Sequence, residues 1–141
     1  LNKQEGNTIS DQNKKTAIDF WESLGQGIPD WKFAAKGKQS SFELRQDQVH
    51  AHGVALQALA NVGVAVLDAG EEFKPLLKKL SNVDWRRANT SQWEGRALVA
   101  GVINRSQMNV ILTGNVLKAH LNLKLTPSEL KVEQKHLEGN K

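Results

Sequence analysis

The fold of this chain is decided by the stretch HGVALQALANVGVAVLDAG, residues 52–70. Its apolar residues recur near helical spacing, which predicts a helix. Its alanines favour that helix and permit the close approach of a neighbouring element. The same spacing continues upstream to Ser40 or Ser41, either of which could cap the helix, with Glu43 near the first turn. Gly70 is expected to end it. We predict that this is the longest helix and the scaffold of the domain.

Shorter helices are expected on both sides. One begins near Ser10, as its cap, and ends among residues 25–29, where two glycines and a proline occur. Another covers about residues 71–80, and a third runs from Ser106 or Asn109 to residue 121. The sequence Thr126-Pro127-Ser128-Glu129 is a strong helix start, with threonine as cap, proline in the first turn and glutamate at the third position.

Residues 96–103 fit either a buried helix or a short strand. The pattern as a whole favours an all-α fold, a single compact domain of about five or six helices with one long central helix. We expect residues 1–9 to be a flexible N-terminal segment and residues 10–138 to form the helical domain. The chain begins with Leu1 and its only methionine is Met108. We therefore expect it to be the C-terminal part of a longer protein.

Composition excludes several classes of function. A chain of 141 residues suits one domain, and 39% hydrophobic with 24% charged residues is typical of a globular protein. The absence of cysteine excludes disulfides, thiolate metal sites and cysteine nucleophiles, and it fits a reducing compartment, so a cytoplasmic location is expected. The longest apolar stretch, residues 54–67, is interrupted by polar residues and glycine, so no membrane partner is expected.

Charge is distributed unevenly. The net charge is +4, but residues 74–118 carry eight basic side chains against two acids, a local excess of +6. Four of the five arginines lie between Arg86 and Arg105. A basic middle between neutral flanks suggests an anionic partner, most simply double-stranded DNA. The alternative is a solvated basic face.

The basic stretch also contains Trp85 and Trp93. Arginine forks match phosphate and can read guanine, and tryptophan can stack on a base. The competing interpretations are that both tryptophans anchor the segment in the core and that Arg86 and Arg87 pair with a local acid such as Asp84. Arg96 follows an acid closely and could also be paired internally. The predicted DNA-binding residues are Arg86, Arg87, Arg105, Lys118 and Arg96.

Evidence for catalysis is weak. No nucleophile elbow and no glycine-rich phosphate loop occurs, so no cofactor is expected and the chain is interpreted as not an enzyme. Glu43, Asp47 and His50 would lie on one face of a helix at spacings of four and seven, and such a set could bind a divalent metal. A metal-dependent nuclease is therefore a minor alternative, and a hydrogen-bonded surface is the favoured interpretation of these three residues.

Three runs of the chain resemble one known family. They are ELRQDQVHAHGVALQALANVG (43–63), DWRRANTSQWEGRALVAG (84–101) and NVILTGNVLKAHLNLKLTPSE (109–129). The most specific elements are Arg45 with His50-Ala51-His52-Gly53, the run Trp85-Arg86-Arg87-x-Asn89, Trp93-Glu94-Gly95-Arg96, and the stretch from Leu112-Thr113 to Leu121 followed by Leu125-Thr126. Over about residues 20–133 the chain is similar to the C-terminal part of the DNA sulfur modification protein DndB family.

The resemblance implies a regulator. Members of this family accompany genes that replace a non-bridging phosphate oxygen of DNA with sulfur, and they bind promoter DNA of those genes as negative regulators. The DGQHR motif of the longer family members is absent here. Two hypotheses follow: a DNA-binding regulatory domain that uses the basic segment, or a helical module for homo-oligomer assembly, with DNA binding located elsewhere in the regulator.

Overall fold

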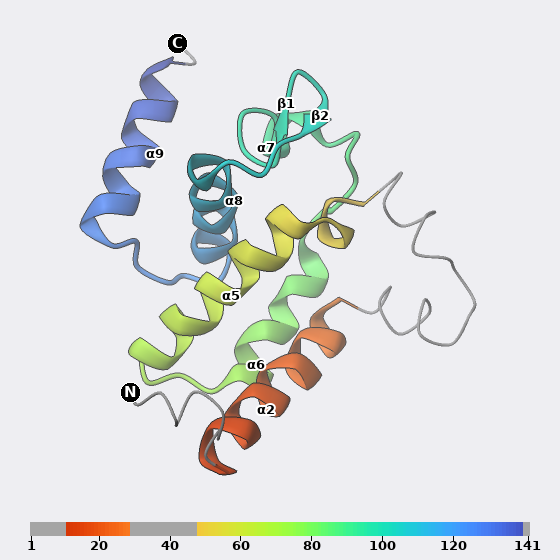
Figure 1. Ribbon diagram of the computed structural model, residues 1–141, viewed down its shortest axis with the longest axis vertical. Helices are drawn as coiled ribbons and strands as arrows, with labels where there is room; N and C mark the ends of the chain where they lie inside the picture. Colours follow the sequence, from red (N-terminus) through yellow and green to blue (C-terminus); the bar gives the residue numbers. More distant parts are fainter. Residues whose placement is uncertain (1–10, 29–47, 140–141) are drawn as a thin grey trace, which may run out of the picture.

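The computed structural model describes residues 11–28 and 48–139 (Figure 1). These residues form six α-helices, two 3-10 helices and one small sheet. In chain order they are α2 (Asp11–Gly27), η1 (Val49–Ala51), α5 (Gly53–Asp68), α6 (Phe73–Leu77), η2 (Lys78–Asn82), α7 (Thr90–Trp93), β1 (Leu98–Val99), β2 (Val102–Ile103), α8 (Gln107–His120) and α9 (Pro127–Gly139). The predicted all-α fold class is confirmed. Within the described part of the chain, no helix has the length and apolarity needed to cross a bilayer.

The helix α5 lies at the centre of the molecule and is packed on two sides (Figure 1). Small residues bring α8 close to it: a Cβ atom at Gly114 would lie 3.8 Å from the Cβ atom of Ala58. Toward α2, the ring of Phe20 occupies the space over Gly63, where a Cβ atom would come within 2.7 Å of it. The alanine-rich stretch therefore makes the close contacts that its composition predicted.

The start of α5 differs from the prediction. A continuous helix from Ser40 or Ser41 was expected, but Gln48 and His52 have extended backbone angles and η1 lies between them. The helix begins only at Gly53 and has 16 residues, so the prediction that it is the longest helix is wrong: α2 has 17. Because the extended Gln48 pairs with Arg86 in an isolated antiparallel bridge, tertiary pairing replaces helix at this point. The predicted caps at residues 40 and 41 lie outside the described residues, as does the expected flexible segment 1–9.

The ambiguous stretch 96–103 contains a β-hairpin whose two strands have two residues each. In it Leu98 pairs with Ile103 and Val99 pairs with Val102. Ala100 and Gly101, at the turn, both have positive φ, which is the geometry of a tight hairpin turn. The carboxylate of Glu94 accepts hydrogen bonds from both of their amides, at 2.6 and 3.1 Å. Of the two predicted alternatives, the short strand is the one that forms.

The two C-terminal helices begin where their capping residues predicted. The Ser106 hydroxyl accepts from the Asn109 amide at the start of α8. At the start of α9, the Glu129 amide donates to the Thr126 hydroxyl, and the Thr126 amide donates to Glu129 Oε1. This reciprocal pair is a capping box, which satisfies two amides that the first turn of the helix leaves without partners.

Candidate nucleic-acid interface

Two stacked tryptophans hold the basic segment in the core. The rings of Trp85 and Trp93 are 5.5 Å apart with 17° between their planes, and both side chains are buried. The Trp93 indole N–H donates to the Asp84 carbonyl at 2.9 Å, and that of Trp85 donates to the Leu80 carbonyl at 3.4 Å. Since their faces are covered and their N–H groups are satisfied, the core-anchoring interpretation is confirmed, and base stacking is not available to them in this conformation.

The same segment is fixed to the residues that precede α5. The Val49 amide donates to the Trp85 carbonyl at 2.7 Å. The buried His50 ring lies edge-on to Trp85, with 5.5 Å between ring centroids. His50 is therefore part of the core. The other two members of the predicted metal set, Glu43 and Asp47, lie outside the described residues. Within the described ranges no group of three or more His, Asp or Glu could hold a metal ion.

Arg86 projects into solvent from this anchored backbone. Its side chain is 67% exposed and forms a two-point ion pair with Asp84, Nε to Oδ1 at 2.9 Å and Nη2 to Oδ2 at 2.8 Å. Hydrogen bonds from the Arg86 side chain and backbone lower the pKa of Asp84 to about 2. The local ion-pair interpretation of Arg86 is confirmed. Exposed ion pairs of this kind contribute little to stability, so the guanidinium can exchange its partner at low cost.

Arg87 and Arg105 are also at the surface. Arg87 is half-buried, and its Nη2 donates to the Gly101 carbonyl at the hairpin turn at 3.2 Å. Arg105 is exposed and packs against the first residue of α5, where a Cβ atom at Gly53 would lie 3.2 Å from its Nη1. The hairpin and the N-terminal end of α5 lie toward the same end of the molecule (Figure 1).

The other two predicted residues, Arg96 and Lys118, are covered. Arg96 forms a two-point ion pair with Glu133, Nη1 to Oε1 at 2.8 Å and Nη2 to Oε2 at 2.7 Å, and its side chain is 11% exposed. Lys118 is 3% exposed, and its Nζ lies 2.5 Å from Glu129 Oε2. Arg96 is paired internally, as one interpretation of the sequence held, but its partner lies 37 residues away and not beside it.

Sequence reasoning missed Glu129 and Glu133 as partners of these cations. Burial raises the pKa of Glu129, but hydrogen bonds from Lys118 and Thr126 outweigh it and leave the pKa below its usual value. Hydrogen bonds from Arg96 lower the pKa of Glu133 against the effect of burial, with help from Asn115. Both carboxylates are therefore ionised at neutral pH and complete the ion pairs.

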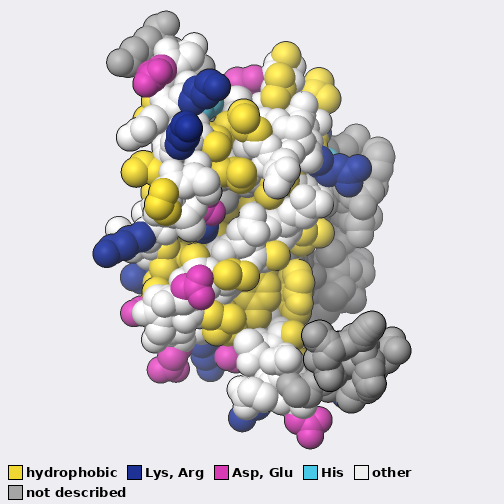
Figure 2. All heavy atoms as spheres, turned by 60° about the vertical axis from the view of Figure 1, so that its left-hand side comes forward, with side chains coloured by type: hydrophobic (Ala, Val, Ile, Leu, Met, Phe, Trp, Pro, Cys, Tyr) yellow, Lys and Arg dark blue, Asp and Glu magenta, His cyan; other side chains and the backbone are white. Residues whose placement is uncertain are grey.

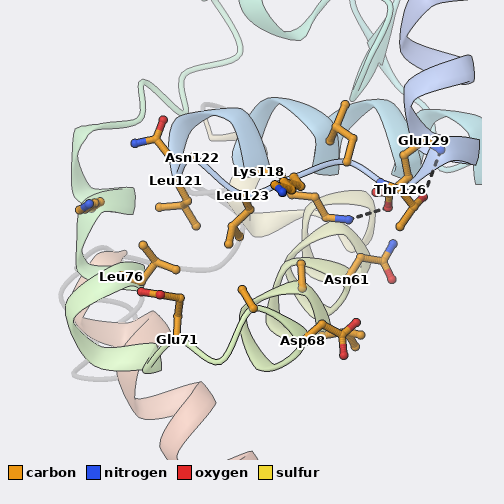
Figure 3. Close-up of a pocket in the computed structure, with 16 residues that line it drawn as sticks. Asn61, Asp68, Glu71, Leu76, Lys118, Leu121, Asn122, Leu123, Thr126 and Glu129 are labelled. Carbon is orange, nitrogen blue, oxygen red and sulfur yellow. Dashed lines mark hydrogen bonds and ion pairs between the residues drawn. The ribbon is translucent and has the colours of Figure 1, made fainter.

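A groove of about 870 Å³ opens beside one of these pairs (Figure 3). It lies between the C-terminal half of α5 and the C-terminal end of α8, and the loop between α8 and α9 closes one side. In Figure 3 the Lys118 side chain extends toward Glu129 along the groove wall, and Asn61 and Asp68 face it from α5. Solvent therefore has a route to the Lys118–Glu129 pair.

The fold and these side chains define a helical domain with an arginine-bearing surface segment pinned by buried tryptophans, and with two further cations covered by its last helix. A family model described as DndB, DNA-sulfur modification-associated, matches residues 1–124. The chain therefore belongs to the DndB family and is associated with DNA sulfur modification. Comparison with curated proteins gives no match. Comparison with solved structures gives none either.

Proposed function

We propose that this chain is a DNA-binding negative regulator of DNA phosphorothioate modification genes, acting on their promoter DNA. Membership of a family associated with DNA sulfur modification is the observation that carries the proposal. The uneven charge supports it, because residues 74–118 hold an excess of +6 in a chain whose net charge is +4. Arg96 and Lys118 of this segment are covered, but its other six basic side chains are partly or fully exposed and can attract the DNA backbone whatever its sequence.

The arrangement of three arginines supports a phosphate-contacting role. Arg86, Arg87 and Arg105 all project from backbone that is fixed by the core, through the buried tryptophans or against the start of α5. A guanidinium on fixed backbone starts from a defined position and presents a fork that fits two phosphate oxygens. These three side chains form the contact set of the proposal.

Salt dependence of DNA binding tests the contact set. Each cation that neutralises a phosphate contributes about −0.9 to the slope of log K against log salt. The double variant Arg86→Ala/Arg87→Ala should flatten this slope by about two units on any duplex, because phosphate contacts carry no sequence information. A loss confined to promoter DNA would indicate that these arginines read guanine instead.

The matched control is Lys14→Ala/Lys15→Ala, which removes the same charge from exposed positions on α2. It should change the slope far less than the arginine double variant does. If the two double variants have the same slope as the wild-type chain, the arginines serve only the structure and the contact set is wrong.

A second candidate function, assembly of oligomers, is favoured by an apolar stripe on α5. Leu56, Val64 and Leu67 are 40%, 58% and 53% exposed, and their spacings of eight and three place them on one side of the helix. Hydrophobic side chains are also spread over the face shown in Figure 2. Exposed apolar stripes often mark protein contacts.

The oligomeric state in solution tests this candidate. The variant Val64→Lys/Leu67→Lys places two charges in the stripe, and it should reduce the mass seen by sedimentation if copies associate through α5. The exposed pair Lys74→Ala/Lys78→Ala is a control that leaves the stripe intact. A monomeric wild-type chain over the micromolar range would exclude the assembly role.

A further inference from the structure

The helix α9 docks on the rest of the chain with its charged side. Glu129, Glu133 and His136 are spaced by four and three residues and therefore share one face. The two glutamates pair with cations of the body, and the His136 ring packs over Gly95, where a Cβ atom would lie 2.6 Å from Cε1. None of the residues described in α9 is buried.

Its leucines have the opposite orientation. Leu130 and Leu137, seven residues apart, are 45% and 52% exposed. A surface helix ordinarily turns its apolar stripe inward and its charges outward. In α9 both leucines point outward, and Val132 is the one half-buried apolar residue on the docked face described by the structure. The attachment of the helix therefore depends mainly on its ion pairs. In Figure 1, α9 stands beside α8 at the edge of the molecule.

The guanidinium that receives Glu133 is held in place by the body of the domain. The Arg96 guanidinium donates to the Leu112 carbonyl of α8 at 3.0 Å. The backbone carbonyl of Arg96 accepts from Asn109 Nδ2 at 2.6 Å.

Asn115 is 2% exposed, and its Nδ2 donates to Glu133 Oε1 at 3.1 Å. Its Oδ1 has no hydrogen-bond partner. The body of the domain thus presents one planar guanidinium and one amide N–H₂ to the Glu133 carboxylate, and the same N–H₂ group also donates to the Glu129 backbone carbonyl at 3.2 Å.

These donors match phosphate chemistry. Arginine binds carboxylate and phosphate with the same two-point geometry, so the Glu133 oxygens stand in for two phosphate oxygens. The Lys118 ammonium is a point charge of the kind that also binds phosphate. Its partner carboxylate, Glu129, stands in for a second anionic group at the wall of the groove in Figure 3.

We infer that Arg96, Asn115 and Lys118 form a second phosphodiester-binding site, which α9 fills with Glu129 and Glu133 until the DNA backbone displaces it. This inference rests on the proposed DNA-binding function and names how that function is restrained. Displacement exchanges the two carboxylates for two phosphate groups, so neither buried cation is left without a charge partner. It also exposes no buried residue of α9.

The test measures DNA binding by the complete chain with its two covering charges removed. Glu129→Gln/Glu133→Gln keeps the size of both side chains and weakens their hold on Arg96 and Lys118. The variant should bind a duplex more tightly than the wild-type chain at every salt concentration, because it has no carboxylates to displace. The two proteins should have similar salt slopes, because both neutralise the same phosphates once α9 has left the site.

The matched control is Glu72→Gln/Glu138→Gln, which makes the same change in net charge at two exposed positions. It should leave the affinity for DNA close to that of the wild-type chain. Adding Arg96→Gln/Lys118→Gln to the covering-charge variant should cancel the gained affinity and flatten the salt slope by about 1.8 units, because two phosphate contacts are lost. Circular dichroism and amide exchange in α5 verify that each protein is folded.

Hydrogen exchange supplies a reading that needs no variant. When duplex DNA is added to the wild-type chain, amides of residues 127–139 should exchange faster while those of α5 do not. Slower exchange in α9 would overturn the inference, because it would mean that DNA binds over the docked helix. A covering-charge variant that behaves like its control would overturn it as well.

These results separate the inference from the proposed function. If Arg86→Ala/Arg87→Ala weakens binding and Glu129→Gln/Glu133→Gln does not strengthen it, the proposed function stands and the covered site is wrong. If the wild-type chain binds no DNA but the covering-charge variant does, the covered site stands and the exposed contact set is wrong. If neither protein binds DNA, both are wrong.

Discussion

The helix α8 makes two contacts of opposite chemistry. Toward α5 it presents Gly114 to Ala58, a close apolar contact without a charge. Toward α9 it presents Lys118 and Asn115 to two carboxylates, which Arg96 joins from the neighbouring turn. The first contact depends on the shape of one particular partner. The second depends on charge and hydrogen bonding, which another anion can supply. The two sides of one helix therefore differ in whether the partner can be replaced without unfolding the domain.

The largest expected effect is on the apolar side of this comparison. Trp93→Ala removes a fully buried ring that stacks on Trp85, so we expect a loss of about 3–5 kcal/mol in the free energy of unfolding. Urea denaturation measures it. Trp21→Ala, at a position that is 49% exposed on α2, is the control and should cost much less. Equal losses would mean that Trp93 is not a central part of the core.

The next effect tests the close packing of α5 on α2. Gly63→Ala places a methyl group 2.7 Å from the Phe20 ring, which must then move within the core. Overpacking of this kind costs about 1–3 kcal/mol. Gly139→Ala, where a Cβ atom meets nothing within 4 Å, is the comparison. A Gly63→Ala protein as stable as the wild-type chain would show that α2 can shift away from α5 freely.

On the ionic side, Glu133→Gln should act locally. Removing one partner of a buried ion pair ordinarily lowers the free energy of unfolding substantially. Here α9 can detach locally, which lets Arg96 reach solvent. We expect the global free energy of unfolding to change by less than about 1 kcal/mol, while amides of residues 127–139 lose protection in hydrogen exchange. A large loss of global stability would show that α9 unfolds only together with the core.

The smallest expected effect is the loss of α9 docking on acidification, which leaves the protein unchanged at neutral pH. It tests directly whether ionised carboxylates hold the helix. Glu129 and Glu133 have pKa values below their ordinary 4.5 when α9 is docked. Their contribution is therefore complete well above pH 4.5 and is lost as the pH falls through the lowered values. Exchange of α9 amides should accelerate as the pH falls below the ordinary glutamate value of 4.5, after correction for intrinsic rates. Uniform protection of α9 across this range would contradict docking by ionised carboxylates.

Much of the fold could be predicted from local patterns. The capping residues Ser106 and Thr126, the alanine-rich stretch and the buried tryptophans all act within a few residues or through composition, and each appears in the structure as expected. The long helix was misjudged at residues 48–52, where helical spacing continues but Gln48 pairs with Arg86. Periodicity cannot reveal such a pairing, because its partner is distant in the sequence.

The candidate site shows the same division. Sequence alone identified the basic segment and five candidate DNA-binding cations among its eight, and the ion pair between Arg86 and Asp84 is local enough to be foreseen. Only the tertiary structure separated Arg86, Arg87 and Arg105 at the surface from Arg96 and Lys118 beneath α9. The reason is that exposure and charge pairing depend on which segments meet in space. A capping box needs only four consecutive residues, whereas the partner of Arg96 depends on how α9 packs against α8.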